Sequence, residues 1–170
     1  MAGIPLPAEL RIEQVPYTHP DARFLDEEVQ AEYVVRYGTP DRTRMDPSEF
    51  ETPDGAFYVG YRDDQPVIMG GWRFRPDVTR LDSQSAVEVK RMYVAPAARR
   101  GGLARLMLAH LEATARTAGA DVIILETGTA QPEAMALYES AGYQRVDPFG
   151  YYRDHPSNRC YGRLLGASEV

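Results

Sequence analysis

The chain has 170 residues, 44% of them hydrophobic, which fits one domain of ordinary size with a substantial core. Its net charge of −6 argues against general nucleic-acid binding, which needs a basic surface, and suits either a cationic substrate or simple solubility. No run of about 18 apolar residues could span a membrane, and no basic segment followed by an apolar one begins the chain, so we expect no secretory signal.

The cysteine and histidine content points to a cytoplasmic protein without a metal. Cys160 is the single cysteine, so no disulfide can form within the chain, and we predict that it is a small core residue. The three histidines are scattered and form no pair at helical spacing, so no metal site is predicted.

The first half of the chain predicts a strand, a helix and an antiparallel hairpin. Residues 1–9 contain two prolines and are expected to form a flexible arm, and residues 10–15 alternate as in a strand. Apolar residues then recur at helical spacing up to the C-terminal cap Gly38, namely Phe24, Leu25, Val29, Tyr33 and Tyr37. The hairpin strands are 57–61 and 67–74, and Gly70–Gly71 predicts a bulge or a close backbone approach.

The second half predicts a crossover between parallel strands. A strand over 87–94 leads into a helix that stops at Gly119, and the all-apolar run 122–125 is typical of a buried parallel strand. The buried face of that helix is predicted to hold Leu103, Leu106, Met107, His110, Leu111 and Thr114. A helix from Pro132 to Gly142 and strands over 143–146 and 159–165 complete an α/β (α+β) chain.

The turn between strand 87–94 and the next helix is the most informative segment. Its glycines bring a helix N-terminus and a row of backbone N–H groups to one spot, where a phosphate would bind. The Walker pattern is excluded because Gly-Lys-Ser/Thr is missing, and the dinucleotide pattern because the glycine spacing fails. The alternative is a plain turn with solvated arginines.

Two motifs then resemble those of the GNAT N-acetyltransferase superfamily. The pattern Arg99-x-x-Gly102-x-Ala104 is similar to that family's acyl-coenzyme A signature, Gln/Arg-x-x-Gly-x-Gly/Ala. The segment 131–143, Gln-Pro-Glu-Ala-Met-Ala-Leu-Tyr-Glu-Ser-Ala-Gly-Tyr, resembles the family's Asn-x-x-Ala-x-x-Leu-Tyr-x-x-x-Gly-Phe block. The resemblance implies a GNAT domain over 10–166, with a single mixed sheet of about six to seven strands and about four flanking helices.

The resemblance also implies an activity and its partners. It implies transfer of an acetyl group from acetyl-coenzyme A to a primary amine of a small molecule or peptide, in a ternary complex. It further suggests a second copy of the chain as a partner, since members are often homodimers. Two alternatives remain: a non-catalytic module that binds acyl-coenzyme A, and an acetyltransferase that acts on protein lysines or N-termini.

Coenzyme contacts follow from the same resemblance. Backbone groups of Met92, Tyr93 and Val94 would pair with the pantetheine arm. The amides that would surround the pyrophosphate belong to Arg99, Arg100, Gly101, Gly102, Leu103 and Ala104. Gln131 stands where the family's block has Asn, and is the remaining candidate contact.

The chemistry requires a base for the amine and a proton donor for the leaving thiolate. Deprotonating a lysine-like amine of pKa ~10.4 at pH 7 costs about 4–5 kcal/mol. Glu88 is the predicted base because it precedes Arg99 by the offset found in the histone-acetylating branch of the family; the alternative is an ion pair with Lys90 or a surface charge. Glu126 is the rival base, or a residue that binds a cationic substrate.

The proton donor and the acceptor pocket are predicted from tyrosines and loops. Tyr138 matches the family tyrosine that protonates the thiolate, the alternative being a core tyrosine with a satisfied hydroxyl. Tyr151, Tyr152 and Trp72 are candidate walls of the acceptor pocket, or ordinary aromatic residues. We expect that pocket to be built from the loops 39–55, 76–85 and 147–158.

Overall fold

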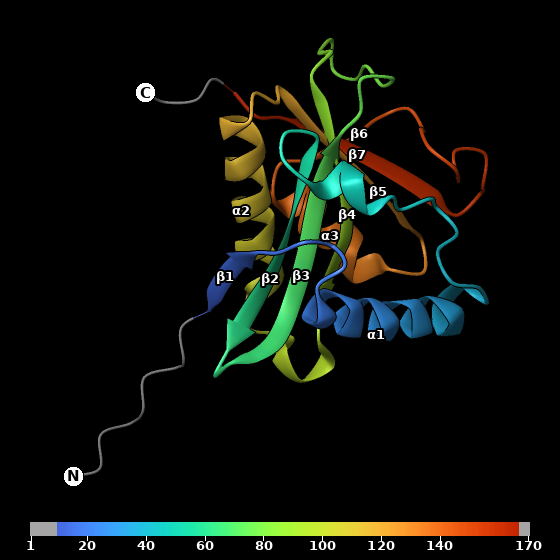
Figure 1. Ribbon diagram of the computed structural model, residues 1–170. Coiled ribbons are helices and arrows are strands. Elements are labelled where there is room, and N and C mark those ends of the chain that lie inside the picture. The colour runs from blue at the N-terminus through green and yellow to red at the C-terminus, as the bar shows by residue number, and fades with distance from the viewer. Residues whose placement is uncertain (1–9, 167–170) are drawn as a thin grey trace.

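The computed structural model describes residues 10–166, and a seven-stranded mixed sheet runs through them in the order β1-β2-β3-β4-β5-β7-β6 (Figure 1). The predicted arm, residues 1–9, lies outside the described residues. The strands are β1 Arg11–Gln14, β2 Gly55–Arg62, β3 Gln65–Phe74, β4 Ala86–Val94, β5 Val122–Gly128, β6 Gln144–Arg145 and β7 Asn158–Leu164.

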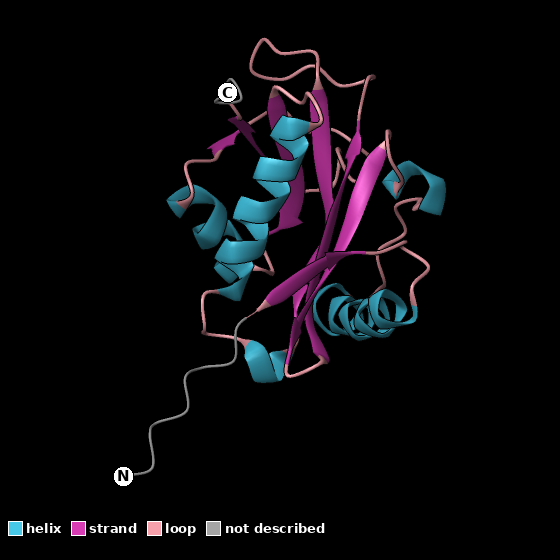
Figure 2. Ribbon diagram, turned by 60° about the vertical axis from the view of Figure 1, so that its left-hand side comes forward, coloured by secondary structure: helices cyan, strands magenta, loops and turns pink. Residues whose placement is uncertain are grey.

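Helices cover both faces of this sheet (Figure 2). Within residues 10–166 they are α1 Pro20–Tyr37, α2 Leu103–Thr117 and α3 Pro132–Ser140, with short 3₁₀ turns η1 Pro47–Phe50 and η2 Pro96–Ala98. The expectation of about four helices is therefore slightly too high. The segment 39–55 contains three prolines and forms only the turn η1, whose first N–H groups are capped by Asp46.

The two faces bury separate sets of apolar side chains. The N-terminal part of α1 buries Ala22, Leu25 and Val29 on one face, whereas the other face packs against α2 and α3. Leu106 is 54% exposed, contrary to the prediction, because the buried stripe of α2 runs through Leu103, Met107, Leu108, Leu111 and Ala115. Cys160 is confirmed as a core residue, and burial raises the pKa of its thiol to about 11.

The sheet opens between β4 and β5, which diverge after a short paired region. These strands are parallel, but they pair only where Ala86–Glu88 meets Val122–Ile124. β4 then continues along β3 as far as Val94, while β5 continues along β7. The edge of β4 over residues 89–94 therefore has no strand partner on the β5 side. The Val94 carbonyl accepts from Arg99 Nε over 3.0 Å, and the other backbone groups on that side are available to a ligand.

A bulge lies in the same part of β4. The β3–β4 register shifts between Met69 and Gly71, so Arg91 and Met92 together face the single residue Gly70. A Cβ on Gly70 would lie 3.6 Å from the Met92 Cα, so the strands approach closely there. The predicted bulge at Gly70–Gly71 is confirmed, and its extra residue is on β4.

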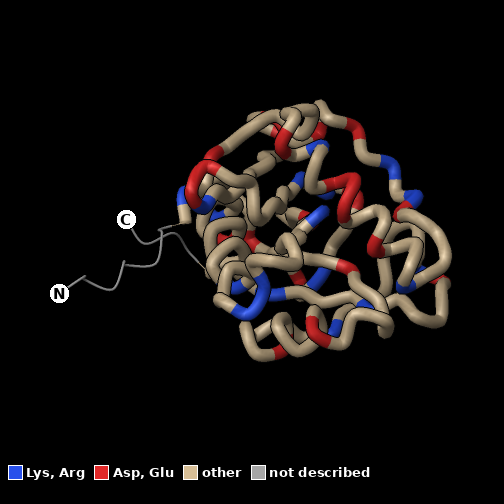
Figure 3. The backbone as a smooth tube through the Cα atoms, turned by 90° about the horizontal axis from the view of Figure 1, so that it is seen from below, with Lys and Arg blue, Asp and Glu red and all other residues tan. Residues whose placement is uncertain are grey.

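The charged residues of both signs are interspersed over the fold and do not separate into two faces (Figure 3). None of the helices formed by residues 10–166 is long and apolar enough to cross a membrane.

Candidate functional site

A cleft of about 790 Å³ lies where β4 and β5 diverge, with walls from β4, β5, α3, the start of α2 and the C-terminal half of α1. It brings together most of the residues singled out in the sequence: Met92, Tyr93, Val94, Arg99, Arg100, Gly102, Leu103, Ala104, Glu126, Gln131, Tyr138 and Tyr152. Gly101 belongs to the same turn without lining the cleft, and Glu88, Trp72 and Tyr151 lie elsewhere.

The turn before α2 has the conformation of an anion site. Arg100 and Gly102 adopt positive φ angles of 72° and 76°, so successive backbone groups curve around one point. Gly102 is the N-cap of the 15-residue helix α2, and no side chain caps the first N–H groups there. These groups and the positive end of the helix are therefore free to bind an anion.

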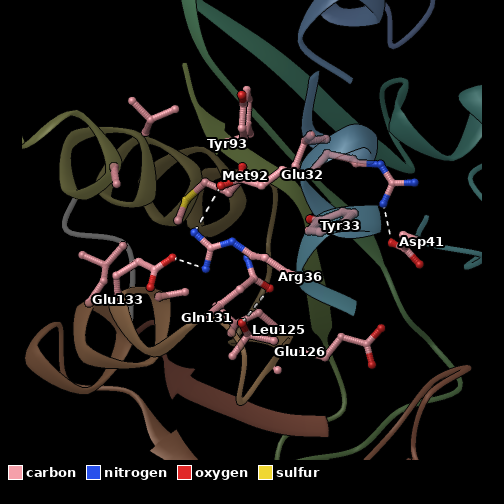
Figure 4. A pocket seen from close by; sticks show the side chains of 18 of the residues that line it. Glu32, Tyr33, Arg36, Asp41, Met92, Tyr93, Leu125, Glu126, Gln131 and Glu133 are labelled. Atoms are coloured by element: carbon pink, nitrogen blue, oxygen red, sulfur yellow. Dashed lines mark hydrogen bonds and ion pairs between the residues drawn. The ribbon is translucent and has the colours of Figure 1, made fainter. Parts of the chain in front are cut away.

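Helix α1 supplies a wall that the sequence did not reveal. Arg36 reaches across the cleft, where it donates to the Ala130 carbonyl over 2.9 Å and pairs with Glu133 and Glu32 (Figure 4). Glu32 also accepts from Arg99 Nη2 over 2.9 Å. The helical spacing of α1 indicated only a core face, and no motif marks Glu32 or Arg36.

Gln131 faces α1 rather than open solvent. Its Oε1 accepts from the Tyr37 hydroxyl over 3.0 Å. Gly128 lies beside this contact, and a Cβ there would lie 2.3 Å from the Tyr37 hydroxyl oxygen, so a larger residue would displace the Tyr37 side chain. The Gln131 side chain therefore connects the start of α3 to α1 at the cleft wall.

Tyr138 lies on α3 with 7% of its surface exposed, against Tyr143 and Tyr161 at ring distances of 5.8 and 6.0 Å. Burial raises the pKa of its phenol, and no charged or hydrogen-bonding neighbour among the described residues contributes to this change. The hydroxyl therefore stays protonated at neutral pH, as a proton donor must.

Glu126 lies at the end of the cleft that also holds Asp41 (Figure 4). Its side chain is 9% exposed, with Lys90 Nζ at 3.7 Å and Asn158 Nδ2 donating over 3.2 Å. Burial, followed by the nearby charges of Glu88 and Asp41, raises the pKa of Glu126, while Lys90 lowers it. A carboxylate with a raised pKa is suited to accept a proton near neutral pH.

Glu126 also lines a second pocket of about 410 Å³. Its walls come from the three loops expected to build an acceptor pocket, including Thr43 and Glu49, Pro76 and Asp77, and Gly150 and Tyr151. The floor holds Glu88 with Arg73 and Arg75.

Glu88 is buried in ion pairs and does not line the cleft. Its Oε1 accepts from Arg73 Nε over 3.1 Å and from Arg75 Nη1 over 2.8 Å. The alternative partner considered from the sequence, Lys90, instead faces Asp41 and Glu126 at 3.5 and 3.7 Å. The two base candidates thus lie beside one pocket, and the geometry favours Glu126 because it also faces the cleft.

The aromatic candidates separate into three environments. Trp72 is 3% exposed and donates from Nε1 to Thr114 on α2, which moves it from the acceptor site to the core. The hairpin face that carries it is covered by α2, a contact that strand periodicity does not reveal. Tyr151 lines the second pocket, whereas Tyr152 lines the cleft and accepts from the Arg42 N–H over 2.7 Å.

Metal ligands do not gather in this part of the molecule. Over residues 10–166, no group of three or more His, Cys, Asp or Glu side chains could hold a metal ion. The polar side chains that line the cleft include guanidinium groups, tyrosine hydroxyls, amides and carboxylates.

Comparisons with known proteins agree with this geometry. The model of the Acetyltransferase (GNAT) family matches residues 22–143. An IAA acetyltransferase of Azospirillum brasilense is 35% identical over 113 residues, which cover 66% of this chain and 69% of that protein. N-acetyltransferase 8 of Homo sapiens is 29% identical over 123 residues, covering 72% of this chain and 53% of that protein.

Solved structures share the fold. A proposed acyl-CoA N-acyltransferase of Klebsiella pneumoniae superimposes with a TM-score of 0.74 at 24% identity, over 92% of this chain and 98% of that one. A GNAT-family acetyltransferase of Staphylococcus aureus gives 0.70 at 15% identity, over 93% and 100%. Because the family model spans most of the chain, including both motifs, this protein belongs to the GNAT family of acetyltransferases.

Proposed function

We propose that this protein transfers an acetyl group from acetyl-coenzyme A directly to the primary amine of a small molecule. The observation that carries the proposal is that Glu126 lines both the cleft and the second pocket. The cleft offers an unpaired strand edge and an anion-binding turn on one side, and the second pocket offers an entrance for the amine on the other.

The residues present fit the coenzyme that the family uses. The edge of β4 over Met92 to Val94 would pair with the extended pantetheine arm, as a neighbouring strand would. The amides from Arg99 to Ala104 would surround the pyrophosphate, with the helix dipole of α2 adding to the attraction. The Arg99 and Arg100 guanidinium groups would supply charge at the same place.

The amine must lose its proton before it attacks. An ammonium arriving through the second pocket would meet the Glu126 carboxylate, which would take one proton and pass it to solvent. Attack forms the N–C bond and breaks the C–S bond. The second amine proton leaves through solvent, while the sulfur receives one from a donor in the cleft.

Two groups of the chain would stabilise the charges that develop. Backbone N–H groups on the free edge of β4 would donate to the thioester carbonyl oxygen as it gains charge. The Tyr138 hydroxyl would donate its proton to the departing thiolate and regain one from solvent.

Turnover with a panel of amines tests this function. The panel should contain aliphatic amines, amino acids, polyamines, and a peptide that has a free N-terminus and a lysine. IAA should be tested beside the panel, since the Azospirillum relative is named for it. We expect release of coenzyme A thiol that depends on a small amine. Coenzyme A binding without acetylation of any amine would instead indicate a regulatory module, and preference for the peptide would indicate a protein acetyltransferase.

The charge on Lys90 gives one expected outcome. Replacing Lys90 by Met removes a cation that lowers the pKa of Glu126, so that pKa should rise further. Because Glu126 must be ionised to act as base, the acidic limb of kcat/KM for the amine should move to higher pH. If the acidic limb stays in place, or moves to lower pH, the charge of Lys90 does not lower the pKa of the base.

A further inference from the structure

We propose that Arg91 is a positioning residue, which holds the bulge of β4 in the conformation that directs the free strand edge toward the thioester. The inference rests on the proposed acetyl transfer and adds to it a residue outside both sequence motifs. Arg91 touches neither the turn before α2 nor Tyr138, and it would act through the backbone that carries it.

The backbone of Arg91 adopts an uncommon conformation. Its φ of 58° lies in the left-handed region, which residues other than Gly, Asn and Asp rarely adopt. The angle follows from the bulge, where Arg91 and Met92 occupy the space opposite one residue of β3. Something outside the strand must stabilise this arrangement in a position that does not carry glycine.

The side chain provides that stabilisation. It is 4% exposed, its Nε donates to Asp26 on α1 over 2.8 Å, and its Nη1 pairs with Asp41 in the loop after α1. Asp26 also accepts from the Tyr17 hydroxyl over 3.2 Å, so the acceptor group is itself fixed. One guanidinium thus ties the bulge to two elements that cover the cleft.

The same ion pairs lead toward the candidate base. Asp41 lies 3.5 Å from Lys90 Nζ, and Lys90 lies 3.7 Å from Glu126. Although burial opposes it, Lys90 and Arg91 together lower the pKa of Asp41, which stays ionised near neutral pH. Arg91 therefore connects the strand edge to the charged end of the cleft, where Asp41 and Glu126 lie (Figure 4).

The bulge decides which backbone groups face the cleft. Side chains and backbone groups alternate in direction along a strand. Loss of the bulge would shift the pairing with β3 by one residue, which reverses the direction of every group that follows. Met92 is part of the bulge, and Tyr93 and Val94 follow it directly. A relaxed bulge would consequently turn their N–H groups relative to the carbonyl oxygen they are proposed to stabilise.

The test is Arg91→Met, which removes both ion pairs while the left-handed backbone stays costly for a residue that has a Cβ. We expect a folded protein that binds coenzyme A within about threefold of the wild type but loses about 10- to 100-fold in kcat, since misplacement by about 1 Å can cost that much. Arg91→Lys should recover part of kcat because it can pair with one carboxylate. The control is Arg163→Gln, which removes an arginine that donates twice to Glu112 and lines neither cavity.

Three results would overturn the proposal: an unchanged kcat in folded Arg91→Met, an equal loss in Arg163→Gln, or a loss confined to KM. If the wild type acetylates no amine, the proposed function fails, and hydrogen exchange of the amides of residues 89–94 decides on Arg91 alone. Faster exchange in Arg91→Met than in the wild type and Arg163→Gln would support the positioning role, and unchanged exchange would refute it.

Discussion

Replacing Glu126 by Gln is expected to lower kcat/KM for the amine at pH 7 by about 10²- to 10⁴-fold, the usual contribution of a general base. The amide keeps the shape of the side chain and can still accept from Asn158, but it cannot take the ammonium proton. Activity should then rise steadily with pH, because only amine that has lost its proton in solution can react. Initial rates from pH 5 to pH 10 measure this change.

The matched control is Glu88→Gln, an identical substitution of the neighbouring carboxylate. The Glu88 charge raises the pKa of Glu126, so its removal should move the acidic limb of the profile to lower pH without abolishing it. Arg73 and Arg75 lose a charged partner, so thermal unfolding must show that the variant is folded under assay conditions. If Glu88→Gln loses the limb and Glu126→Gln keeps it, the base is Glu88.

Tyr138→Phe is expected to lower kcat by about 10² or more, with coenzyme A affinity close to that of the wild type. The ring still fills its place against Tyr143 and Tyr161, so the change removes only the hydroxyl of a side chain that lines the cleft. Because burial raises the pKa of the phenol, the wild type should lose no activity to Tyr138 ionisation between pH 7 and about pH 9.

The leaving group offers a direct check on this role. An acetyl thioester whose thiol is more acidic needs less help from a proton donor, so the deficit of Tyr138→Phe should shrink with such a substrate. An unchanged kcat in the variant would make Tyr138 a core tyrosine. If the loss of kcat is the same for both thioesters, the Tyr138 hydroxyl does not act by protonating the departing thiolate.

The sequence predicted the part of the site that lies on one continuous segment. Strand, turn and helix over residues 86–117 form a local unit. The glycines and arginines of its turn are a local pattern that indicates a phosphate-binding site. The hairpin, its bulge and the parallel pairing of β4 with β5 were likewise predictable, because period-two alternation, Gly70–Gly71 and an all-apolar run are local signals.

Contacts between distant segments were not predictable from such signals. Arg36 meets Ala130 across 94 positions, and Arg91 meets Asp26 across 65, with no motif at any of these residues. Glu88 and Glu126 looked like rivals on separate strands, yet the sheet places both beside one pocket. Trp72 and Leu106 differ from prediction because helix packing decides which face is covered, and strand or helix spacing alone does not.

The central claim is direct transfer from acetyl-coenzyme A to an amine in the cleft, and the amounts of the two products test it most directly. Coenzyme A thiol and acetylated amine should be measured in the same sample, with wild-type protein, Glu126→Gln and Tyr138→Phe. We predict one acetylated amine for each thiol released by the wild type, intersecting double-reciprocal plots, and a much lower rate for both variants. Thiol release without acetylated amine, or parallel plots with the acetyl group found on the protein, would contradict it.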